Sequence, residues 1–322
     1  MRKFFLLATL VLIVIGSCKK DDDGIESIPP RTLSEQVNVD NDSIVDYLST
    51  HFYNYEEFEN PPAGFDYRIK IGKIEGANAD KKPLIEQVKT KIIALRSDQM
   101  GAPVSGDEEV DHKLYYLEAL KGEGLAPKFS DSVYVRYEGS LLDGRIFDGA
   151  TEVPVWFNGI TVVRGMAASL PFFNAGVNPT GNPDGTFNVD GYGVGMIIMP
   201  SALGYFGASQ PGIPAYSPLI FKLDMMSVNE ADHDRDGVPT WREDLNGNEY
   251  VLDDNTDEQR ERDRRAAILP DYIDPDDDGD LKPTRTEVTD IDNNVLFPYP
   301  DTNNDGTPDY LDYDIRRDPE DN

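Results

Sequence analysis

The side chains that could take part in chemistry are few in this chain of 322 residues, and most of them are apolar. A series of aromatic and aliphatic residues runs from Val133 to Phe221, interspersed with Asp148 and several glycines. The only histidines are His51, His112 and His233, and the only cysteine is Cys18. A Ser-His or Cys-His relay is hard to build from so few groups. Outside the aromatic and aliphatic series, the sequence offers no other catalytic constellation.

Four stretches carry the series: Val133-Tyr-Val-Arg-Tyr137-Glu-Gly139, Asp143-Gly-Arg-Ile-Phe147-Asp148, Val162-Val163-Arg-Gly165, and Ile213-Pro214 followed by Leu219-Ile-Phe221. In their order and most of their spacings they resemble the FKBP-type peptidyl-prolyl cis-trans isomerases, over roughly residues 112–229. The resemblance implies a pocket lined by Tyr137, Phe147, Val162, Val163, Met166, Tyr205, Ile213 and Phe221. It also implies that Asp148 is a buried carboxylate that orients the pocket. The Tyr205 hydroxyl and the Ile213 amide would donate to the substrate backbone.

A pocket of this kind suits the rotation of an X-Pro peptide bond, which faces a barrier of ~20 kcal/mol. Water stabilises the charge-separated resonance form of an amide, so an apolar site weakens the resistance to rotation. A dry aromatic cup with a few donors placed for the twisted carbonyl would then suffice. The expected activity is isomerisation of X-Pro bonds in exported client proteins or peptides.

Two departures from the family pattern leave a second interpretation open. Met166 stands where the family usually has tryptophan on the pocket floor, which keeps the floor apolar but loses a rigid ring. Phe206 interrupts the expected Tyr-Gly pair, and residues 174–195 form a polar insertion. The alternative is a lipoprotein that binds proline-containing peptides, or mediates surface adhesion, on an FKBP scaffold without catalysis.

A second group of residues has the spacing of calcium ligands. Twelve-residue loops start at Asp232 and Asp301, and the first half of another starts at Asp274, with Arg285 at its twelfth position. Alternating carboxylates around a tight turn bring hard oxygens to one point, which is what Ca²⁺ requires. The expected ligands are Asp232, Asp234, Asp236, Val238 (backbone carbonyl) and Glu243; Asp274, Asp276, Asp278 and Glu287; and Asp301, Asn303, Asp305, Thr307 and Asp312.

These loops resemble the Asp-rich calcium-binding units of thrombospondin type 3 and related bacterial surface proteins. Pro239, Pro283 and Pro308 interrupt the units, so flanking helices of EF-hand length are not expected. The region holds little apolar surface, and bound calcium would supply much of its stability. The alternative is a disordered acidic tail that binds no calcium and only keeps the protein well solvated.

The N-terminus has the pattern of an export signal. Arg2 and Lys3 precede an apolar run that ends near Ile15, and Ile15-Gly-Ser-Cys18 resembles a bacterial lipoprotein processing box. We expect a signal peptide over residues 1–17 and lipidation of Cys18, which would anchor the protein at the bacterial outer membrane or cell surface. A plain secretory signal with an incidental cysteine is the alternative. The acidic stretch at residues 19–23 resembles the export tag of Bacteroidetes-type surface lipoproteins.

The remaining segments predict an α+β fold, in which a twisted antiparallel sheet wraps on a short helix. A linker is expected at 18–38, and an N-terminal helical region at 39–108 with helices from Asp42 or Ser43 to His51 and from Pro83 to Arg96. These helices would pack on the sheet or form a homodimer. The FKBP-like domain is expected at 109–229, with residues 174–195 as a loop and a short helix after Arg164. The acidic calcium-repeat region covers 230–322.

Charge limits the choice of partners. The net charge is −30, and the segment from Glu230 onward holds 30 acidic and 10 basic residues. Nucleic acid is excluded as a partner, because phosphate binding needs clustered lysines and arginines. Calcium, a lipid membrane reached through Cys18, and proline-containing clients are the partners that the sequence favours.

Overall fold

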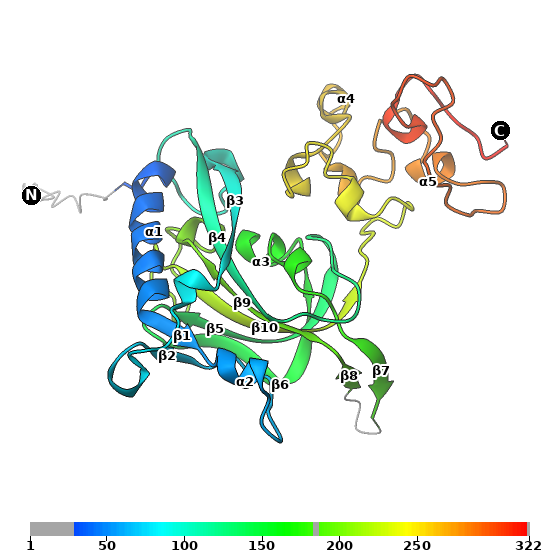
Figure 1. The fold of residues 1–322 in the computed structure, drawn as a ribbon. Helices are drawn as coiled ribbons and strands as arrows, with labels where there is room; N and C mark the ends of the chain where they lie inside the picture. Colours follow the sequence, from blue (N-terminus) through cyan, green and yellow to red (C-terminus); the bar gives the residue numbers. More distant parts are fainter. Residues whose placement is uncertain (1–28, 183–186, 321–322) are drawn as a thin grey trace, which may run out of the picture.

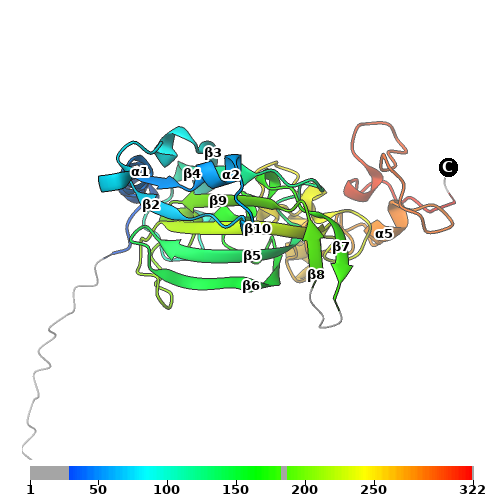
Figure 2. The same ribbon diagram turned by 60° about the horizontal axis from the view of Figure 1, so that its bottom comes forward.

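The computed structural model describes residues 29–182 and 187–320. Its centre is a six-stranded antiparallel sheet with strand order β3-β4-β9-β10-β5-β6, shown in Figures 1 and 2. The strands are β3 (Lys89–Arg96), β4 (Glu109–Leu120), β5 (Ser132–Leu141), β6 (Ile146–Asn158), β9 (Gly193–Met199) and β10 (Leu219–Asn229). The expected α+β fold with an antiparallel sheet is confirmed. The predicted signal peptide and Cys18 lie outside the described residues.

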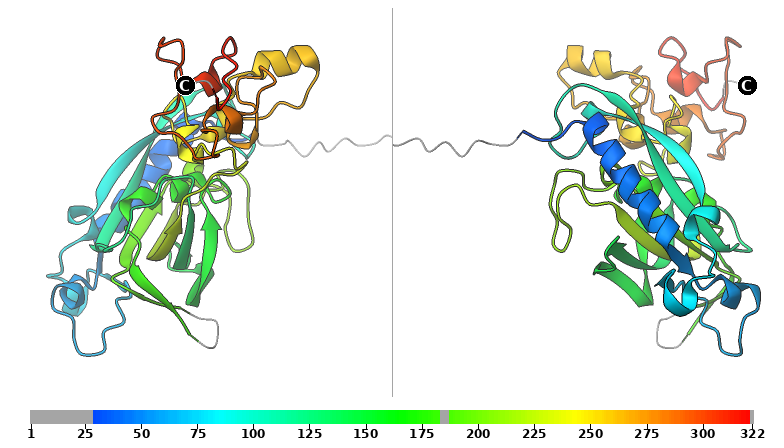
Figure 3. Two further views of the ribbon diagram at one scale, coloured as in Figure 1. Left: turned by 90° about the vertical axis from the view of Figure 1, so that its right-hand side faces the viewer. Right: turned by 60° about the vertical axis from the view of Figure 1, so that its left-hand side comes forward.

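Both faces of the sheet are covered, which explains why every residue of β9 is buried. One face carries Ile197, Leu223 and Val135 into a cluster with the short helix α3 (Arg164–Ala167). The opposite face carries Met196 and Ile220 into a second cluster, together with residues of α1 (Leu33–Thr50). Figure 3 shows α1 lying across that face. Side chains alternate between faces along a strand, so one strand serves both clusters.

Helix α1 begins nine residues before the Asp42 at which it was expected to start, and therefore includes part of the segment expected as linker. Thr32 caps it: its side chain accepts from the Glu35 N–H at 3.1 Å, and the Glu35 side chain accepts from the Thr32 N–H at 3.0 Å. This reciprocal capping box fixes the start of the helix. Its apolar side, including Ile44 and Leu48, is fully buried within the chain. No helix in the described ranges has the length and apolar character needed to cross a bilayer.

The helix expected from Pro83 to Arg96 is wrong. A single 3-10 turn at Leu84–Glu86 is followed by strand β3, which pairs with β4 along its whole length. Ile93 and Leu95 are buried while the intervening Ala94 is exposed, and Ile92 is 52% exposed. Burial therefore follows a two-residue period, and the β-branched residues Thr90, Ile92 and Ile93 favour the extended backbone.

The insertion at 174–195 is not only a loop. Strands β7 (Val177–Gly181) and β8 (Phe187–Asp190) form a separate antiparallel hairpin in it. A further two-stranded sheet joins β1 (His51–Tyr53) to β2 (Ile71–Lys73), next to the five-residue helix α2 (Tyr55–Glu59). Most of the hairpin residues are polar or glycine, so the hydrophobic pattern of a strand is weak there.

The C-terminal region is a chain of acidic loops with short turns and two short helices, α4 (Glu258–Arg264) and α5 (Thr284–Glu287). It lies at one end of the sheet, beyond α3 (Figure 1). Its contact with the sheet domain includes a cluster of Phe129 with Val251 and Tyr272. The Asp131 carboxylate also accepts from the Ala231 N–H at 3.1 Å. The region thus packs on the domain through both apolar and polar contacts.

Candidate active site and acidic loops

The predicted pocket residues gather on the α3 side of the sheet. Tyr137, Met166, Ile213 and Phe221 are buried members of one hydrophobic cluster, and Phe147, Val162, Val163 and Tyr205 pack against it. The Phe147 and Phe221 rings meet edge to face at a centroid distance of 5.6 Å. Strands β5, β6 and β10 bring these rings together, because Gly139 pairs with both Asp148 and Phe221 in the sheet.

Asp148 is tied to this cluster by one strong hydrogen bond. Its Oδ2 accepts from the Tyr137 hydroxyl at 2.6 Å, and its Oδ1 accepts from the Gly149 N–H at 2.9 Å. The prediction that Asp148 is buried is wrong: the residue is exposed, because β6 is an edge strand. Burial of the tyrosine, followed by its bond to Asp148, raises the pKa of Tyr137. Burial and the charge of Asp148 also raise the pKa of Tyr205, so both hydroxyls stay protonated and able to donate.

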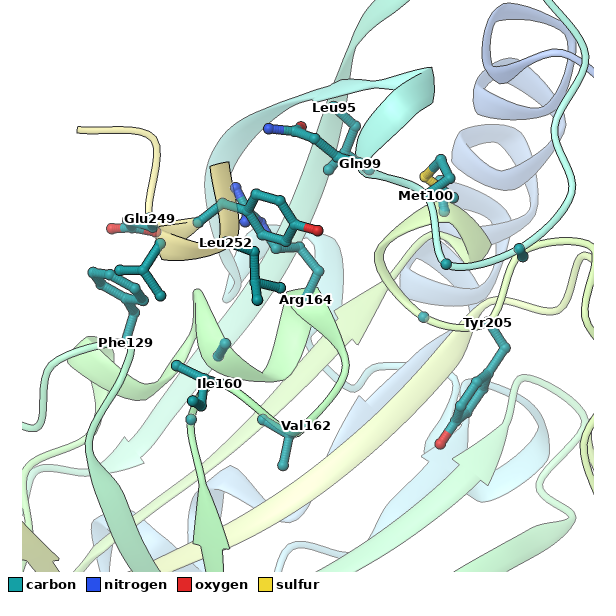
Figure 4. Close-up of a pocket in the computed structure, with 18 of the residues that line it drawn as sticks. Leu95, Gln99, Met100, Phe129, Ile160, Val162, Arg164, Tyr205, Glu249 and Leu252 are labelled. Atoms are coloured by element: carbon teal, nitrogen blue, oxygen red, sulfur yellow. The ribbon is translucent and has the colours of Figure 1, made fainter. Parts of the chain in front are cut away.

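A cavity of about 300 Å³ adjoins the cluster. Val162 and Tyr205 line it, and Figure 4 shows the tyrosine extending away from its loop at one end of the cavity. The Tyr205 hydroxyl has no hydrogen-bond partner within the part of the chain that the structure describes. The other seven predicted residues lie outside the lining. The predicted pocket is thus divided between a closed ring cluster and an open cavity that shares two of its residues.

The donor role expected for the Ile213 amide is wrong for the chain in this state. Its N–H already donates to the Gln210 carbonyl at 2.9 Å, and the Gln210 N–H donates back to the Ile213 carbonyl. This pair closes a tight turn in which Gly212 has a φ of +78°. A donor without an acceptor among the described residues is the Val163 N–H, at the start of α3 between the cavity-lining residues Val162 and Arg164.

One wall of the cavity comes from residues that the sequence analysis did not single out. Glu249, Tyr250, Val251 and Leu252 of the C-terminal region line it opposite Tyr205 (Figure 4). Arg164 holds this segment: its guanidinium donates to the Asn248 carbonyl at 2.7 Å and lies 4.6 Å from the centre of the Tyr250 ring. Burial lowers the pKa of Arg164. Arg164 stands next to Gly165 in the motif quoted above, so the sequence marked its position. No local pattern indicated that its partners would be Asn248 and Tyr250.

The acidic loops share one backbone design. In the loops that start at Asp232, Asp276 and Asp301, the fourth and sixth residues all have positive φ, and proline stands at the eighth position. In each loop the first carboxylate accepts from the N–H of the sixth residue, at 3.1, 3.0 and 3.0 Å respectively. A tight turn of this kind directs the side chains of positions one, three and five toward one point.

In the first loop the structure brings Asp234, Asp236 and Glu243 together. Their oxygens lie within 4.8 Å of one another and of Asp277, a residue that was not predicted. Burial, with the neighbouring carboxylates, raises the pKa of Glu243 to about 10 and that of Asp234 to about 8. Asp232 is not in this group, and its carboxylate accepts from the Arg235 and Gly237 N–H groups. The Val238 N–H donates to Asp236 at 2.7 Å.

The reading frame predicted for the second loop is wrong by two residues. The loop starts at Asp276, so Asp276, Asp278 and Asp280 take the first, third and fifth positions and group together. Glu287 then falls on the twelfth position, and Leu281 takes the positive-φ place of the usual glycine with a φ of +79°. Asp274 instead groups with Asp257 and Glu261 of the α4 region. The matching Pro239-Thr240 and Pro283-Thr284 pairs were the sequence signal for this frame.

The third loop is more exposed. The Asn303 amide donates to Asp305 at 3.1 Å and to Asp312 at 2.9 Å, which places the twelfth residue beside the third and fifth, and the Thr307 N–H donates to Asp305. A further loop with the same backbone starts at Asp244, where Gly247 and Glu249 have positive φ and the Glu249 N–H donates to Asp244 at 2.9 Å. The sequence analysis missed it because its third and fifth residues are asparagines.

The first two loops suit a hard divalent cation. Buried oxygens of Asp234, Asp236, Glu243, Asp278, Asp280 and Glu287 have no hydrogen-bond partner among the described residues. Buried carboxylates without partners are costly, and carboxylate oxygens at flexible distances are the ligands that Ca²⁺ prefers. The buried carboxylate clusters can therefore bind ions, and the atoms that they offer as ligands are carboxylate oxygens.

Comparison with known proteins gives two separate similarities. The chain is 30% identical over 179 residues to the FKBP-type peptidyl-prolyl cis-trans isomerase FkpA of Escherichia coli strain K12, which covers 55% of the chain and 58% of that protein. It is 27% identical over 128 residues to the peptidyl-prolyl cis-trans isomerase Mip of Coxiella burnetii, covering 39% of the chain and 49% of Mip. The match thus spans well under two thirds of either relative.

Among solved structures, FkpA from E. coli is 22% identical with a TM-score of 0.31, and the match covers 61% of this chain and 63% of that one. An isomerase from Pseudomonas syringae is 26% identical with a TM-score of 0.30, covering 36% and 76%. A family model described as BamM C-terminal matches residues 233–300. The middle of the chain is therefore similar to FKBP-type peptidyl-prolyl isomerases, and its acidic region to the C-terminal part of BamM.

Proposed function

We propose that this chain catalyses cis-trans isomerisation of X-Pro bonds, with the proline bound where the Tyr205 end of the cavity meets the ring cluster. The observation that carries the proposal is the convergence of Tyr205, Val162 and the Tyr137–Asp148 pair beside a cavity of about 300 Å³. The similarity to FKBP-type isomerases supports it.

The described residues provide what this reaction needs. The apolar residues exclude water from the amide, which lowers the cost of twisting it. The Tyr205 hydroxyl lines the cavity and has no protein partner among the described residues, so it is available to a substrate carbonyl. The Val163 N–H is a second donor without a partner there. Asp148 fixes the Tyr137 ring through its 2.6 Å bond and is not required to exchange a proton. No covalent intermediate is needed.

An isomerisation assay on proline peptides with the full chain tests the proposal. We expect Tyr205→Phe to lower kcat/KM about tenfold, since one hydrogen bond to a twisted carbonyl is worth about 1–2 kcal/mol. Phe147→Ala should lower it further by opening the ring cluster. Tyr313→Phe, a change in the distant acidic region, is the matched control and should leave the rate unchanged.

A non-catalytic proline-binding module is the second candidate, and the occupied Ile213 N–H favours it. That function would be indicated by peptide binding that depends on Phe147 without any acceleration of isomerisation. Wild-type protein that neither binds proline peptides nor isomerises them would contradict both candidates.

We also propose that the acidic loops bind calcium and that the protein works outside the cytoplasm, in the cell envelope. Partnerless buried carboxylates in the first two loops support calcium, and the export-signal pattern of the N-terminal sequence supports a location outside the cytoplasm. Anchoring to the outer membrane or cell surface through lipidated Cys18, and a homodimer formed by the N-terminal helical region, remain predictions. Mass spectrometry of the purified membrane form would reveal acylation of Cys18.

A further inference from the structure

Asp277 occupies a position in its own loop that does not face that loop's carboxylates. It is the second residue of the loop that starts at Asp276, and positions one, three and five supply the inward-facing carboxylates. The second residues of the other two predicted loops are His233 and Thr302. In all three loops the ninth side chain bonds to the second residue: the Asp277 N–H donates to the Thr284 hydroxyl at 3.1 Å, for example. This shared contact fixes the backbone at the second position, and Asp277 is absent from the carboxylate group of its own loop.

The Asp277 side chain enters the carboxylate group of the first loop. The residue is 1% exposed, and neither of its oxygens has a hydrogen-bond partner among the described residues. It groups with Asp234, Asp236 and Glu243: one oxygen from each of the four residues lies within 4.8 Å of the others. No hydrogen bond or ion pair of the described chain reaches the Asp277 carboxylate, although the charge of Arg285 acts on the neighbouring Asp236.

Four carboxylates in one buried space repel each other strongly, so the arrangement is stable only with protons or a cation between them. Six of their oxygens have no partner: one each on Asp234 and Asp236, and both on Glu243 and Asp277. An all-oxygen set of this size fits Ca²⁺, which takes six to eight oxygen ligands. Mg²⁺ keeps most of its waters and fits a closed carboxylate set less well.

The structure assigns Asp277 as the closing ligand of the first loop's cation, so that a single Ca²⁺ bridges the first and second acidic loops. This assignment rests on the proposed calcium binding of the loops. It makes the two loops one folding unit, because neither loop completes the site alone. The bridge joins Asp277 to residues 34 to 43 positions before it in the chain, and it orders segments that share little apolar surface.

Calorimetric titration of Ca²⁺ into the metal-free full chain tests the bridge. Asp277→Asn should weaken one site at least tenfold and leave the other sites unchanged, whereas Asp263→Asn, on the exposed side of α4, should change nothing. In chelator, Asp277→Asn should be at least as stable as wild type, since one buried carboxylate has gone. In Ca²⁺, Glu243→Gln in the first loop should speed hydrogen exchange of residues 276–287 in the second.

The outcomes separate the assignment from the general proposal. If wild type binds Ca²⁺ and Asp277→Asn binds it with the same affinity, the bridge is wrong while calcium binding stands. If Asp277→Asn is destabilised equally with and without Ca²⁺, its role is structural and the bridge is also wrong. If wild type binds no Ca²⁺ at millimolar concentration, both the bridge and the calcium proposal are wrong. None of these results depends on isomerase activity.

Discussion

Gly139 shows how closely the pocket rings are set against the sheet. A Cβ at this position would lie 2.6 Å from Cε2 of Phe147 and 2.9 Å from Cε1 of Phe221. Both distances are shorter than any ordinary carbon contact, so the missing side chain is what lets the two rings lie over the strand. The glycine therefore sets the shape of the site although it cannot contact a substrate through a side chain.

We expect Gly139→Ala to lower the free energy of unfolding by about 1–3 kcal/mol, because the rings must move to admit the methyl group. Since Phe147 and Phe221 would be displaced, kcat/KM for proline peptides should fall as well. Gly101→Ala is the control for stability only, because a Cβ there meets no atom within 4 Å but the residue lines the cavity. Urea denaturation measures the change in the free energy of unfolding, and the isomerisation assay measures the change in kcat/KM. Unchanged stability would show that the Phe147 and Phe221 rings can move aside without cost.

Residue types could be predicted from the sequence better than residue environments. The series from Tyr137 to Phe221 identified side chains that do lie together. Sequence alone could not show that Asp148 is exposed, since that follows from β6 being the last strand of the sheet. It also could not show that the Ile213 N–H is already used, because a hydrogen-bond partner depends on the fold of the whole turn.

The pairing of β5 with β10 places an ion pair inside the sheet. Asp224 and Arg136 are directly opposite in the register, with Oδ2 and a guanidinium nitrogen 2.9 Å apart. Both side chains are mostly buried, and burial raises the pKa of Asp224 to about 6 although Arg136 opposes the change. The folded protein thus holds a proton on Asp224 at a higher pH than the unfolded chain does.

This cross-strand pair makes stability depend on pH. The contribution of Asp224 is fully present below about pH 4 and is lost as the pH rises through about 6. In Asp224→Asn the free energy of unfolding should therefore fall less steeply between pH 4 and 6, by about 1–3 kcal/mol relative to wild type. Urea denaturation at fixed calcium concentration measures the slope. Asp107→Asn, an exposed change, should keep the wild-type slope, and an unaltered slope in Asp224→Asn would contradict the argument.

At the scale of elements, secondary structure could be predicted where the apolar residues followed one spacing only. The prediction failed where helical and strand spacing both fitted. In β5, residues from Ser132 to Tyr137 alternate in burial with a period of two, which is the pattern of a strand alone. Residues 83–96 place apolar side chains so densely that helical and strand spacing both fit, and only pairing with β4 decides between them. The second acidic loop was placed two residues early because Asp274 and Asp276 both begin an alternating run, and the proline at the eighth position fixes the choice.

At the scale of the molecule, the acidic region is joined to the sheet domain by charged contacts as well as apolar ones. The Arg96 guanidinium donates to Asp253 at 2.9 Å, and the Gln99 amide donates to the same oxygen at 2.8 Å. Lys91 pairs with Glu249. These contacts hold the segment that lines the cavity, and no local pattern predicts them because the partners lie more than 150 residues apart.

Removal of calcium should weaken the contacts between the acidic region and the sheet domain without unfolding the sheet. We expect chelation to speed hydrogen exchange in residues 232–288 and, through the same chain segment, at the cavity wall 249–252. Helix α1 and strand β9 should keep their protection, because both belong to the apolar clusters of the sheet domain. Hydrogen-exchange mass spectrometry with and without chelator makes the comparison. Equal exchange at 249–252 in both conditions would show that the wall does not depend on metal.

The position of residues 249–252 also determines which fragment of the protein is worth assaying. A fragment cut at residue 229 would retain the sheet, α3 and every ring of the cluster, yet one side of the cavity would be missing. It would present a wider, wetter opening and would accept bulkier peptides than the intact protein does. Substrate preferences measured on the trimmed domain would then describe the fragment and not the intact chain.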